Sequence, residues 1–275
     1  MTEPMSKGRM RTANQANAML DHPPPRIVPT VAEVARDLCS CLRQAGNPER
    51  ARGAQQYFKQ AIVALGIPAS ALRRLVRERA QPLRACWQAR EAISLCDRLL
   101  REPELEIRAA GILVLAAFKR ELTPDRLQSA ERWLRQRLDN WALVDGFCSA
   151  VLSPSLERYP HFETTVTAWS GAESLWLRRA ALVTFVPLAR HGRRLDTAYR
   201  LAQEHFDDPE DLMHKATGWL LREAGKTDRR RLRQFLLQHG PAIPRTALRY
   251  AIERFSASER TELLQTTRAS RKGTE

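Results

Sequence analysis

The sequence predicts an all-α protein, a superhelix of stacked helix pairs with a concave basic groove. Three observations favour this fold class. Apolar residues recur every three or four positions, helix-capping residues precede the apolar stripes, and one short block of residues returns along the chain. No segment alternates apolar and polar residues convincingly with period two, so we expect no sheet. An irregular helical bundle is the alternative architecture.

The expected helices follow from the apolar stripes and the residues that bound them. One stripe covers residues 31–42 and a second covers residues 72–76. A third covers residues 127–138 and is opened by Thr123-Pro124-Asp125, because a capping residue followed by proline starts a helix. Further starts of this kind are Asn47-Pro48-Glu49, Ser153-Pro154 and Asp208-Pro209-Glu210. Glycine is common just past helix ends, and the expected ends are marked by Gly46, Gly192 and Gly240.

A repeated block indicates how these helices are arranged. Residues 107–112 resemble residues 177–182, and residues 213–218 continue the pattern, with weaker copies that begin at residues 140 and 244. The starts lie 31 to 37 residues apart, which leaves room in each unit for two helices and a turn. Units of this length are typical of HEAT-like repeats, which stack into a solenoid with a concave face.

Basic residues dominate the charge of the chain. It has 45 Lys and Arg against 31 Asp and Glu, a formal net charge of +14. This excess favours a polyanionic partner, with nucleic acid first and an anionic membrane surface second. One cation per repeat suits phosphates along a groove, and the cations of the block are Arg108, Arg178, Arg179, Lys215 and Arg245. For any single arginine, a solvated helix face is the alternative.

We expect one folded domain, over residues 30–267. Residues 1–29 lack an apolar stripe and contain three consecutive prolines, so a disordered basic tail is expected there, with a second tail over residues 268–275. The longest apolar run, residues 111–118, is too short to cross a membrane, and the N-terminus lacks a secretory pattern. The five cysteines form no disulfide framework and the six histidines match no metal motif, so we expect neither metal nor cofactor.

A tryptophan occurs in each of three successive repeats, close to charged residues. Trp141 and Asp145 are four residues apart, so both project from one face of a helix. An aromatic face and a carboxylate in a basic groove can together hold a cation. Asp145 stands among apolar neighbours, where it needs a functional role or a partner, and a purely structural partner could be Arg179 or Lys215. For each tryptophan alone, core packing is an equal alternative. The group also contains Trp176, Trp219 and Arg222.

Four stretches, taken in order along the chain, are similar to the elements of one enzyme family. They are residues 57–59 with 65–68 and 73–74, residues 140–145, residues 175–181, and residues 215–223. In that order they resemble the Tyr-x-Lys…Leu-Gly-Ile…Arg-Arg, Trp-x-x-Val-Asp, Trp-Leu-x-Arg-Ala-Ala and Lys-Ala-x-Gly-Trp-x-Leu-Arg-Glu elements of the DNA alkylation repair (AlkD-like) glycosylases. The similarity runs from Val31 to Phe255. Cys96 departs from the pattern, where tryptophan is frequent, and we expect that position to support packing.

The resemblance implies a HEAT-like solenoid that binds duplex DNA in its concave face. It implies a monofunctional glycosylase of base excision repair, which needs no cofactor. This enzyme hydrolyses the N-glycosidic bond of cationic alkylated purines, such as 3-methyladenine and 7-methylguanine, without flipping the base. By the same resemblance Asp145 is the catalytic carboxylate, and Trp141 and Trp219 flank the deoxyribose. The residues it assigns to the DNA backbone are Arg179, Tyr57, Lys59, Lys215 and Arg222. We expect a monomer in the bacterial cytosol, acting at the nucleoid and not at a membrane.

Two other functions stay open at this point. A non-catalytic HEAT-repeat protein can recognise damaged or branched DNA by shape, and a protein-interaction scaffold is a third class. Asp145 together with Trp141 and Trp219 favours the enzyme, since a pure DNA binder has no need for a carboxylate in a phosphate groove. No lysine is expected beside Asp145 as a Schiff-base nucleophile, so we expect hydrolysis without strand cleavage.

Overall fold

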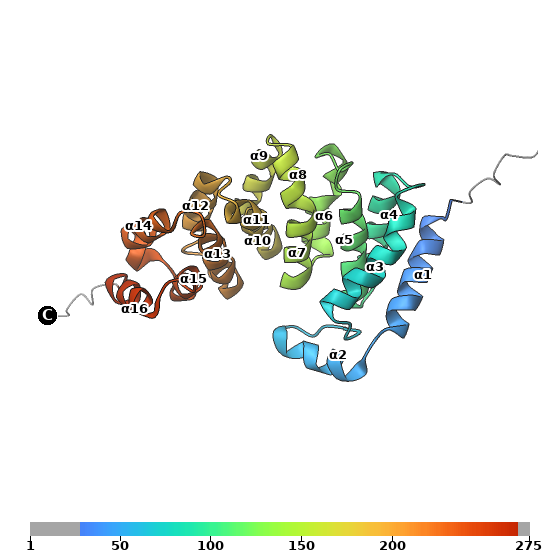
Figure 1. The fold of residues 1–275 in the computed structure, drawn as a ribbon, viewed down its shortest axis with the longest axis horizontal. Coiled ribbons are helices and arrows are strands. Elements are labelled where there is room, and N and C mark those ends of the chain that lie inside the picture. The colour runs from blue at the N-terminus through green and yellow to red at the C-terminus, as the bar shows by residue number, and fades with distance from the viewer. Residues whose placement is uncertain (1–27, 269–275) are drawn as a thin grey trace, which may run out of the picture.

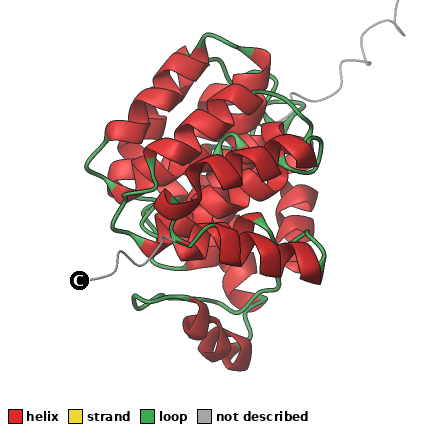
Figure 2. Ribbon diagram, turned by 90° about the vertical axis from the view of Figure 1, so that its left-hand side faces the viewer, coloured by secondary structure: helices red, strands yellow, loops and turns green. Residues whose placement is uncertain are grey.

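The computed structural model describes residues 28–268, whose helices follow one another along an arch (Figure 1). This range holds no strand (Figure 2), only an isolated bridge between Val63 and Glu104, so the predicted all-α fold class is confirmed. The expected tails lie almost entirely outside the described residues.

The α-helices are α1 (Val31–Gln44), α2 (Pro48–Ala54), α3 (Ala69–Leu83), α4 (Ala89–Leu99), α5 (Leu105–Ala117), α6 (Ser129–Gln136), α7 (Trp141–Phe147), α8 (Ser153–Arg158), α9 (Phe162–Ala168), α10 (Leu175–Val183), α11 (Val186–Arg190), α12 (Leu195–Glu204), α13 (Asp211–Ala224), α14 (Arg229–His239), α15 (Arg245–Ala251) and α16 (Ala257–Thr266). Short 3-10 turns are η1 (Gln55–Tyr57), η2 (Asp125–Leu127), η4 (Trp169–Gly171) and η5 (Gly240–Ala242), and η3 (Cys148–Leu152) is a π-helical turn.

Most helix ends lie where the sequence predicts them. Asn47 caps α2, and Gly46, Gly192 and Gly240 each follow a helix. The start at residues 123–125 opens the 3-10 turn η2 rather than α6 itself, so the predicted third helix is divided in two. The start at Asp208 is also misplaced, because α13 begins only at Asp211.

Six helices form what we call the inner row: α3, α5, α7, α10, α13 and α15, each packed on the next. The row follows the lower side of the arch in Figure 1, while α4, α9 and α12 lie on its upper side. All five copies of the repeated block fall on this row, in α5, α7, α10, α13 and α15. A continuous core of buried apolar side chains runs along the arch, and its largest fully buried members include Trp133, Phe118, Phe147 and Phe185.

The cations of the repeated block have partners within the fold. Arg108 pairs with Asp139 at 3.0 Å, and Arg178, at the equivalent position of α10, pairs with Asp208 at 2.7 Å. In both pairs the acid lies 30 or 31 residues further along the chain, just before the next helix of the inner row, where it neutralises the arginine. The other cations of the block are also engaged, Lys215 with Asp211 and Arg245 with the carbonyl of Leu264. The cations of the repeated block therefore have partners within the fold, and their role at phosphates stays a prediction.

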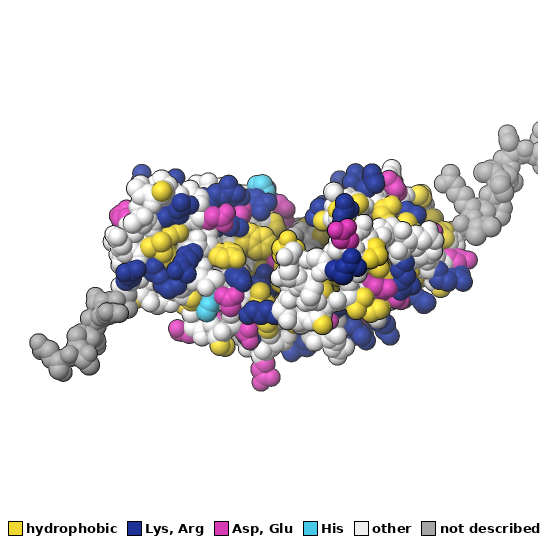
Figure 3. All heavy atoms as spheres, turned by 90° about the horizontal axis from the view of Figure 1, so that it is seen from below, with side chains coloured by type: hydrophobic (Ala, Val, Ile, Leu, Met, Phe, Trp, Pro, Cys, Tyr) yellow, Lys and Arg dark blue, Asp and Glu magenta, His cyan; other side chains and the backbone are white. Residues whose placement is uncertain are grey.

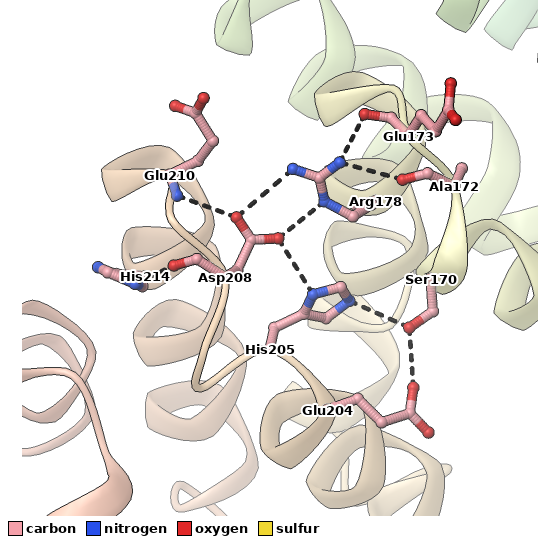
Figure 4. Close-up of polar contacts among 9 residues, drawn as sticks. All are labelled: Ser170, Ala172, Glu173, Arg178, Glu204, His205, Asp208, Glu210 and His214. Atoms are coloured by element: carbon pink, nitrogen blue, oxygen red, sulfur yellow. Dashed lines mark hydrogen bonds and ion pairs between the residues drawn. The ribbon is translucent and has the colours of Figure 1, made fainter.

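Asp208 also anchors a buried polar network (Figure 4). Arg178 donates to Asp208 and to two backbone carbonyls before α10. The His205 Nδ1 atom lies 3.4 Å from an Asp208 oxygen, and its Nε2 atom lies 3.0 Å from the Ser170 hydroxyl, which donates to Glu204. His205 is almost fully buried, and burial, acting against the attraction of Asp208, lowers its pKa.

The lowered pKa of His205 predicts a loss of stability in mild acid. The unfolded chain takes up a proton near the ordinary histidine pKa of about 6.5, while the folded chain resists it, so stability is complete above that pH and falls below it. We expect the melting temperature to drop between pH 7.5 and 5.5, and the drop to be smaller in His205→Asn. The exposed His191→Asn is the control and should keep the full drop. An equal drop in His205→Asn would contradict this assignment.

Candidate active site

The eight site residues predicted from the sequence line a single cavity of about 340 Å³ on the inner row. Helix α7 supplies Trp141 and Asp145, and α10 supplies Arg179. Lys215, Trp219 and Arg222 come from α13, whereas Tyr57 and Lys59 come from η1 and the loop after it. The cavity has three further lining residues that sequence reasoning missed: Gln60, Leu212 and Tyr250. Viewed from below, Lys and Arg side chains are spread along this side of the molecule, with Asp and Glu among them (Figure 3).

An ion pair between Asp145 and Arg179 lies in the wall of the cavity. Arg179 donates from Nε and Nη2 to the two carboxylate oxygens, both at 2.8 Å, and from Nη1 to the carbonyl of Leu212 at 2.5 Å. The Asp145 side chain is 15% exposed and that of Arg179 is 5% exposed. The structural partner that the sequence left open is therefore Arg179, and its role at the DNA backbone stays a prediction.

Burial and the ion pair act in opposite directions on Asp145. Burial raises the pKa of this carboxyl, and the hydrogen bonds and charge of Arg179 lower it, with burial the larger effect. The pKa of Asp145 is therefore above its ordinary value. Arg179 is the group that favours the charged carboxylate, because no other side chain donates a hydrogen bond to Asp145 among the described residues.

Trp141 is held by the loop that follows η1. Its ring stacks on Phe58 with the centroids 5.2 Å apart, and its indole nitrogen donates to the carbonyl of Tyr57 at 3.2 Å. Helix α7 begins at Trp141 because the Asn140 side chain accepts a hydrogen bond from the backbone of Leu143. The helix then passes into the π-helical turn η3, an arrangement common near functional sites.

The loop itself is fixed by two polar side chains that the sequence reasoning did not single out. Gln55 accepts a hydrogen bond from the backbone of Ile62 and donates to two carbonyls of the loop. Glu106 accepts from three successive backbone N–H groups, at Leu65, Gly66 and Ile67, and Gly66 has a positive φ of 76°. The Leu-Gly-Ile element therefore anchors the loop. The sequence signal that could have revealed this contact is Glu106, a carboxylate within the apolar start of α5.

Close packing of α15 on α13 forms the far side of the cavity. A Cβ atom on Gly218 would lie 2.4 Å from the carbonyl oxygen of Ala247 and 2.4 Å from the Cβ atom of Tyr250. Only glycine permits this approach, which places Tyr250 in the same cavity as Trp219. Sequence reasoning could not find Tyr250, because α15 is a weak copy of the repeat.

The cationic side chains of the cavity differ in their partners. Lys215 pairs with Asp211 at 2.8 Å, which raises its pKa, and Arg222 pairs with Glu253. Lys59 is exposed and forms no ion pair within the described range. Lys59 and Lys215 both line the cavity that holds Asp145, and the expectation that neither acts as a Schiff-base nucleophile stays a prediction. The described residues contain no group of His, Cys, Asp and Glu that could hold a metal ion, and no helix there is long and apolar enough to span a membrane.

Comparisons with known proteins identify a family and a similar fold. A family model described as DNA alkylation repair enzyme matches residues 39–255. A solved structure described as a predicted DNA alkylation repair enzyme from Enterococcus faecalis is similar to this chain, with a TM-score of 0.69 and 20% identity. That similarity covers 77% of this chain and 97% of the other. A comparison with curated proteins finds no match.

The contact at Gly218 predicts a large effect from a single methyl group. Gly218→Ala should lower the free energy of unfolding by about 1–3 kcal/mol, because α15 must move away from α13. For a domain of this size, 1 kcal/mol corresponds to about 2–4 °C in melting temperature. Gly53→Ala is the control, since a Cβ atom there meets nothing within 4 Å. Equal melting temperatures for Gly218→Ala and the parent protein would contradict the close packing.

Proposed function

The chain belongs to the DNA alkylation repair enzyme family, and from this premise we propose that it is a DNA glycosylase. Its proposed reaction is hydrolysis of the N-glycosidic bond of cationic alkylated purines, of the 3-methyladenine and 7-methylguanine type, in duplex DNA. The observation that carries the proposal is the cavity in which a buried carboxylate, Asp145, lies with the tryptophans Trp141 and Trp219 among cations. The carboxylate in this basic surrounding favours catalysis over a non-catalytic shape-recognising function.

The chemistry needs little beyond electrostatic stabilisation. An alkylated purine carries a positive charge and leaves with the electron pair of the C1′–N bond, so no general acid is required. Positive charge then develops on the deoxyribose, and the Asp145 carboxylate stabilises it and orients the attacking water. Water adds to C1′ and loses its proton to the carboxylate or to solvent. The faces of Trp141 and Trp219 stabilise the cationic sugar from the side.

This mode of action places the protein's contacts on the sugar and not on the base. A carboxylate and two aromatic faces can stabilise the deoxyribose without a pocket that encloses the purine, which supports excision without base flipping. Lys59 and the aromatic Tyr57 are exposed at the edge of the cavity, where they are available to phosphates. The duplex supplies the polyanion that the net charge of +14 favours.

Hydrolysis without strand cleavage is also part of the proposal. A bifunctional enzyme needs a neutral lysine to attack C1′ and form a Schiff base. The pKa of Lys215 is raised by its hydrogen bond with Asp211, so this amine stays protonated and cannot act as a nucleophile. We therefore expect the product to be an abasic site in an intact strand.

Replacement of the carboxylate tests the proposed mechanism directly. Asp145→Asn keeps the shape and removes the charge, so single-turnover release of bases from methylated duplex DNA should fall by about 10²-fold or more. Affinity for the duplex should stay equal or improve, because a negative charge near the phosphates is gone. Asp207→Asn is the control, since this exposed acid forms no ion pair in the described part of the chain.

The outcome against the proposal is equally specific. If Asp145 served only as a structural partner of Arg179, Asp145→Asn would melt at a lower temperature and still release bases at the parent rate. Melting and excision measured on the same preparation separate the two roles. The absence of base release from the parent protein would instead favour the non-catalytic DNA-binding function.

Removal of the guanidinium should change the pH dependence of excision. In Arg179→Ala, burial of Asp145 acts without opposition, so the pKa of the carboxyl rises further and a higher pH is needed to charge it. The rate of excision, corrected for base release from protein-free DNA at each pH, should fall at pH 7 and recover as the pH rises. Arg179→Lys, which keeps a positive charge, should show a smaller shift. The same loss of activity at every pH would contradict this role.

A further inference from the structure

Trp176, one of the three tryptophans that the sequence groups with charged residues, does not line the candidate active site. It lines a second cavity of about 620 Å³, which we call the Trp176 cavity. The walls of this cavity include Leu105, the first residue of α5, and Asn140, the capping residue of α7. The cavity therefore lies where three successive helices of the inner row begin, and its volume is that of a small-molecule site.

The Trp176 cavity and the candidate active site are neighbours. Gln60, in the loop after η1, lines both of them, and its side-chain amide donates to the Asp139 carbonyl at 2.6 Å. On α10, Trp176 lines one cavity and Arg179 lines the other. Three residues correspond to about 4.5 Å along a helix. A small molecule formed at the candidate active site therefore has a second cavity within one helical turn.

Most charged side chains of the Trp176 cavity already have partners of opposite charge. The ion pairs are Arg108 with Asp139 at 3.0 Å, Arg43 with Glu102 at 2.8 Å, and Arg101 with Asp97 at 2.8 Å. A strongly charged ligand would have to compete with these pairs. The cavity therefore suits a neutral ligand better than a polyanion.

Three polar groups of the cavity form no hydrogen bond or ion pair with other residues in the range 28–268. They are the indole N–H of Trp176, the side-chain amide of Gln136 and the guanidinium of Arg137. Nucleobases stack on aromatic rings and on guanidinium planes. Amide and guanidinium groups also match the donors and acceptors along the edge of a purine. An aromatic face beside these two groups is therefore suited to a planar purine base.

The proposed reaction produces a ligand of this kind. The cationic alkylated purine takes the electron pair of the C1′–N bond, so it leaves the DNA as a neutral, planar base. While it stays beside the cationic sugar, its nitrogen can attack C1′ and form the bond again, in competition with water. A neighbouring cavity that holds the free base removes this competitor.

We propose that the Trp176 cavity binds the free purine base after it has left the DNA. The source of the purine rests on the proposed function, whereas the binding itself does not. The purine ring stacks on Trp176, and Gln136 and Arg137 bind its edge. Asp145 does not line this cavity, so the cavity takes no part in breaking the glycosidic bond.

Equilibrium dialysis against 3-methyladenine, without DNA, tests the site. The parent protein should bind it saturably, with a Kd below about 1 mM. Trp176→Leu should weaken binding by about tenfold or more, because one stacked base is lost. Gln136→Ala should weaken it by about fivefold and melt like the parent, because this side chain is exposed. Trp219→Leu is the matched control and should bind like the parent, since Trp219 lines only the candidate active site.

The absence of saturable binding, or an affinity equal to that of the parent in both Trp176→Leu and Gln136→Ala, would overturn the proposal. Loss of binding in Trp219→Leu alone would place the purine in the candidate active site and would also overturn it.

Single-turnover excision tests when the purine enters the cavity. Gln136→Ala should release bases from methylated duplex DNA at the parent rate. A lower rate would show that the purine enters while still attached to the DNA, against the assignment to the released base. A parent protein that binds 3-methyladenine at this site but releases no base from methylated DNA would contradict the proposed function and still support the purine site.

Discussion

One ion pair connects the helices that line the candidate active site. Through its contacts with Asp145 and with the carbonyl of Leu212, Arg179 ties α10 to α7 and to the start of α13. Taking a carboxylate and a guanidinium out of water is costly, and only the two-pronged geometry and the additional carbonyl offset that cost. The same contact therefore links three consecutive helices of the inner row and favours the charged form of the carboxylate.

The sequence was sufficient to predict the architecture because the same pattern of packing residues recurs in each repeat. Apolar periodicity and the recurring block placed α5, α7, α10, α13 and α15 correctly, and the family elements brought eight residues to one cavity. What failed depended on partners distant in the chain. From the sequence, Arg108 and Arg178 were cations suited to a phosphate groove, whereas in the fold they pair with Asp139 and Asp208. Asp208 was predicted to cap a helix, but it pairs with Arg178. An aspartate can serve either role, and the sequence alone does not distinguish them.

The residues that support the site were harder to find than those that line it. Nothing in the sequence distinguishes Phe58 from other hydrophobic residues. It supports the site by stacking on Trp141, which lies more than eighty residues further along the chain. Tyr250 reaches the cavity only because Gly218 removes a side chain from the helix that faces it. Neither contact leaves a periodic pattern, so only the three-dimensional arrangement reveals it.

The π-helical turn η3 lets one continuous helical segment line the cavity at its start and fill the core at its end. From Trp141 to Arg158 the chain runs through α7, η3 and α8 with hardly a break. An α-helix advances its side chains by about 100° per residue, whereas a π turn spreads one turn over more residues and thereby resets the angular phase of all that follows. Trp141 and Asp145 stand before the reset, on the cavity side, and Val151, Leu152 and Leu156 lie at or beyond it, fully buried. The π turn rotates the residues that follow it relative to those before it. One continuous helical segment can therefore direct Trp141 and Asp145 to the cavity and the later apolar side chains to the core, whereas an unbroken α-helix would place both sets on overlapping faces.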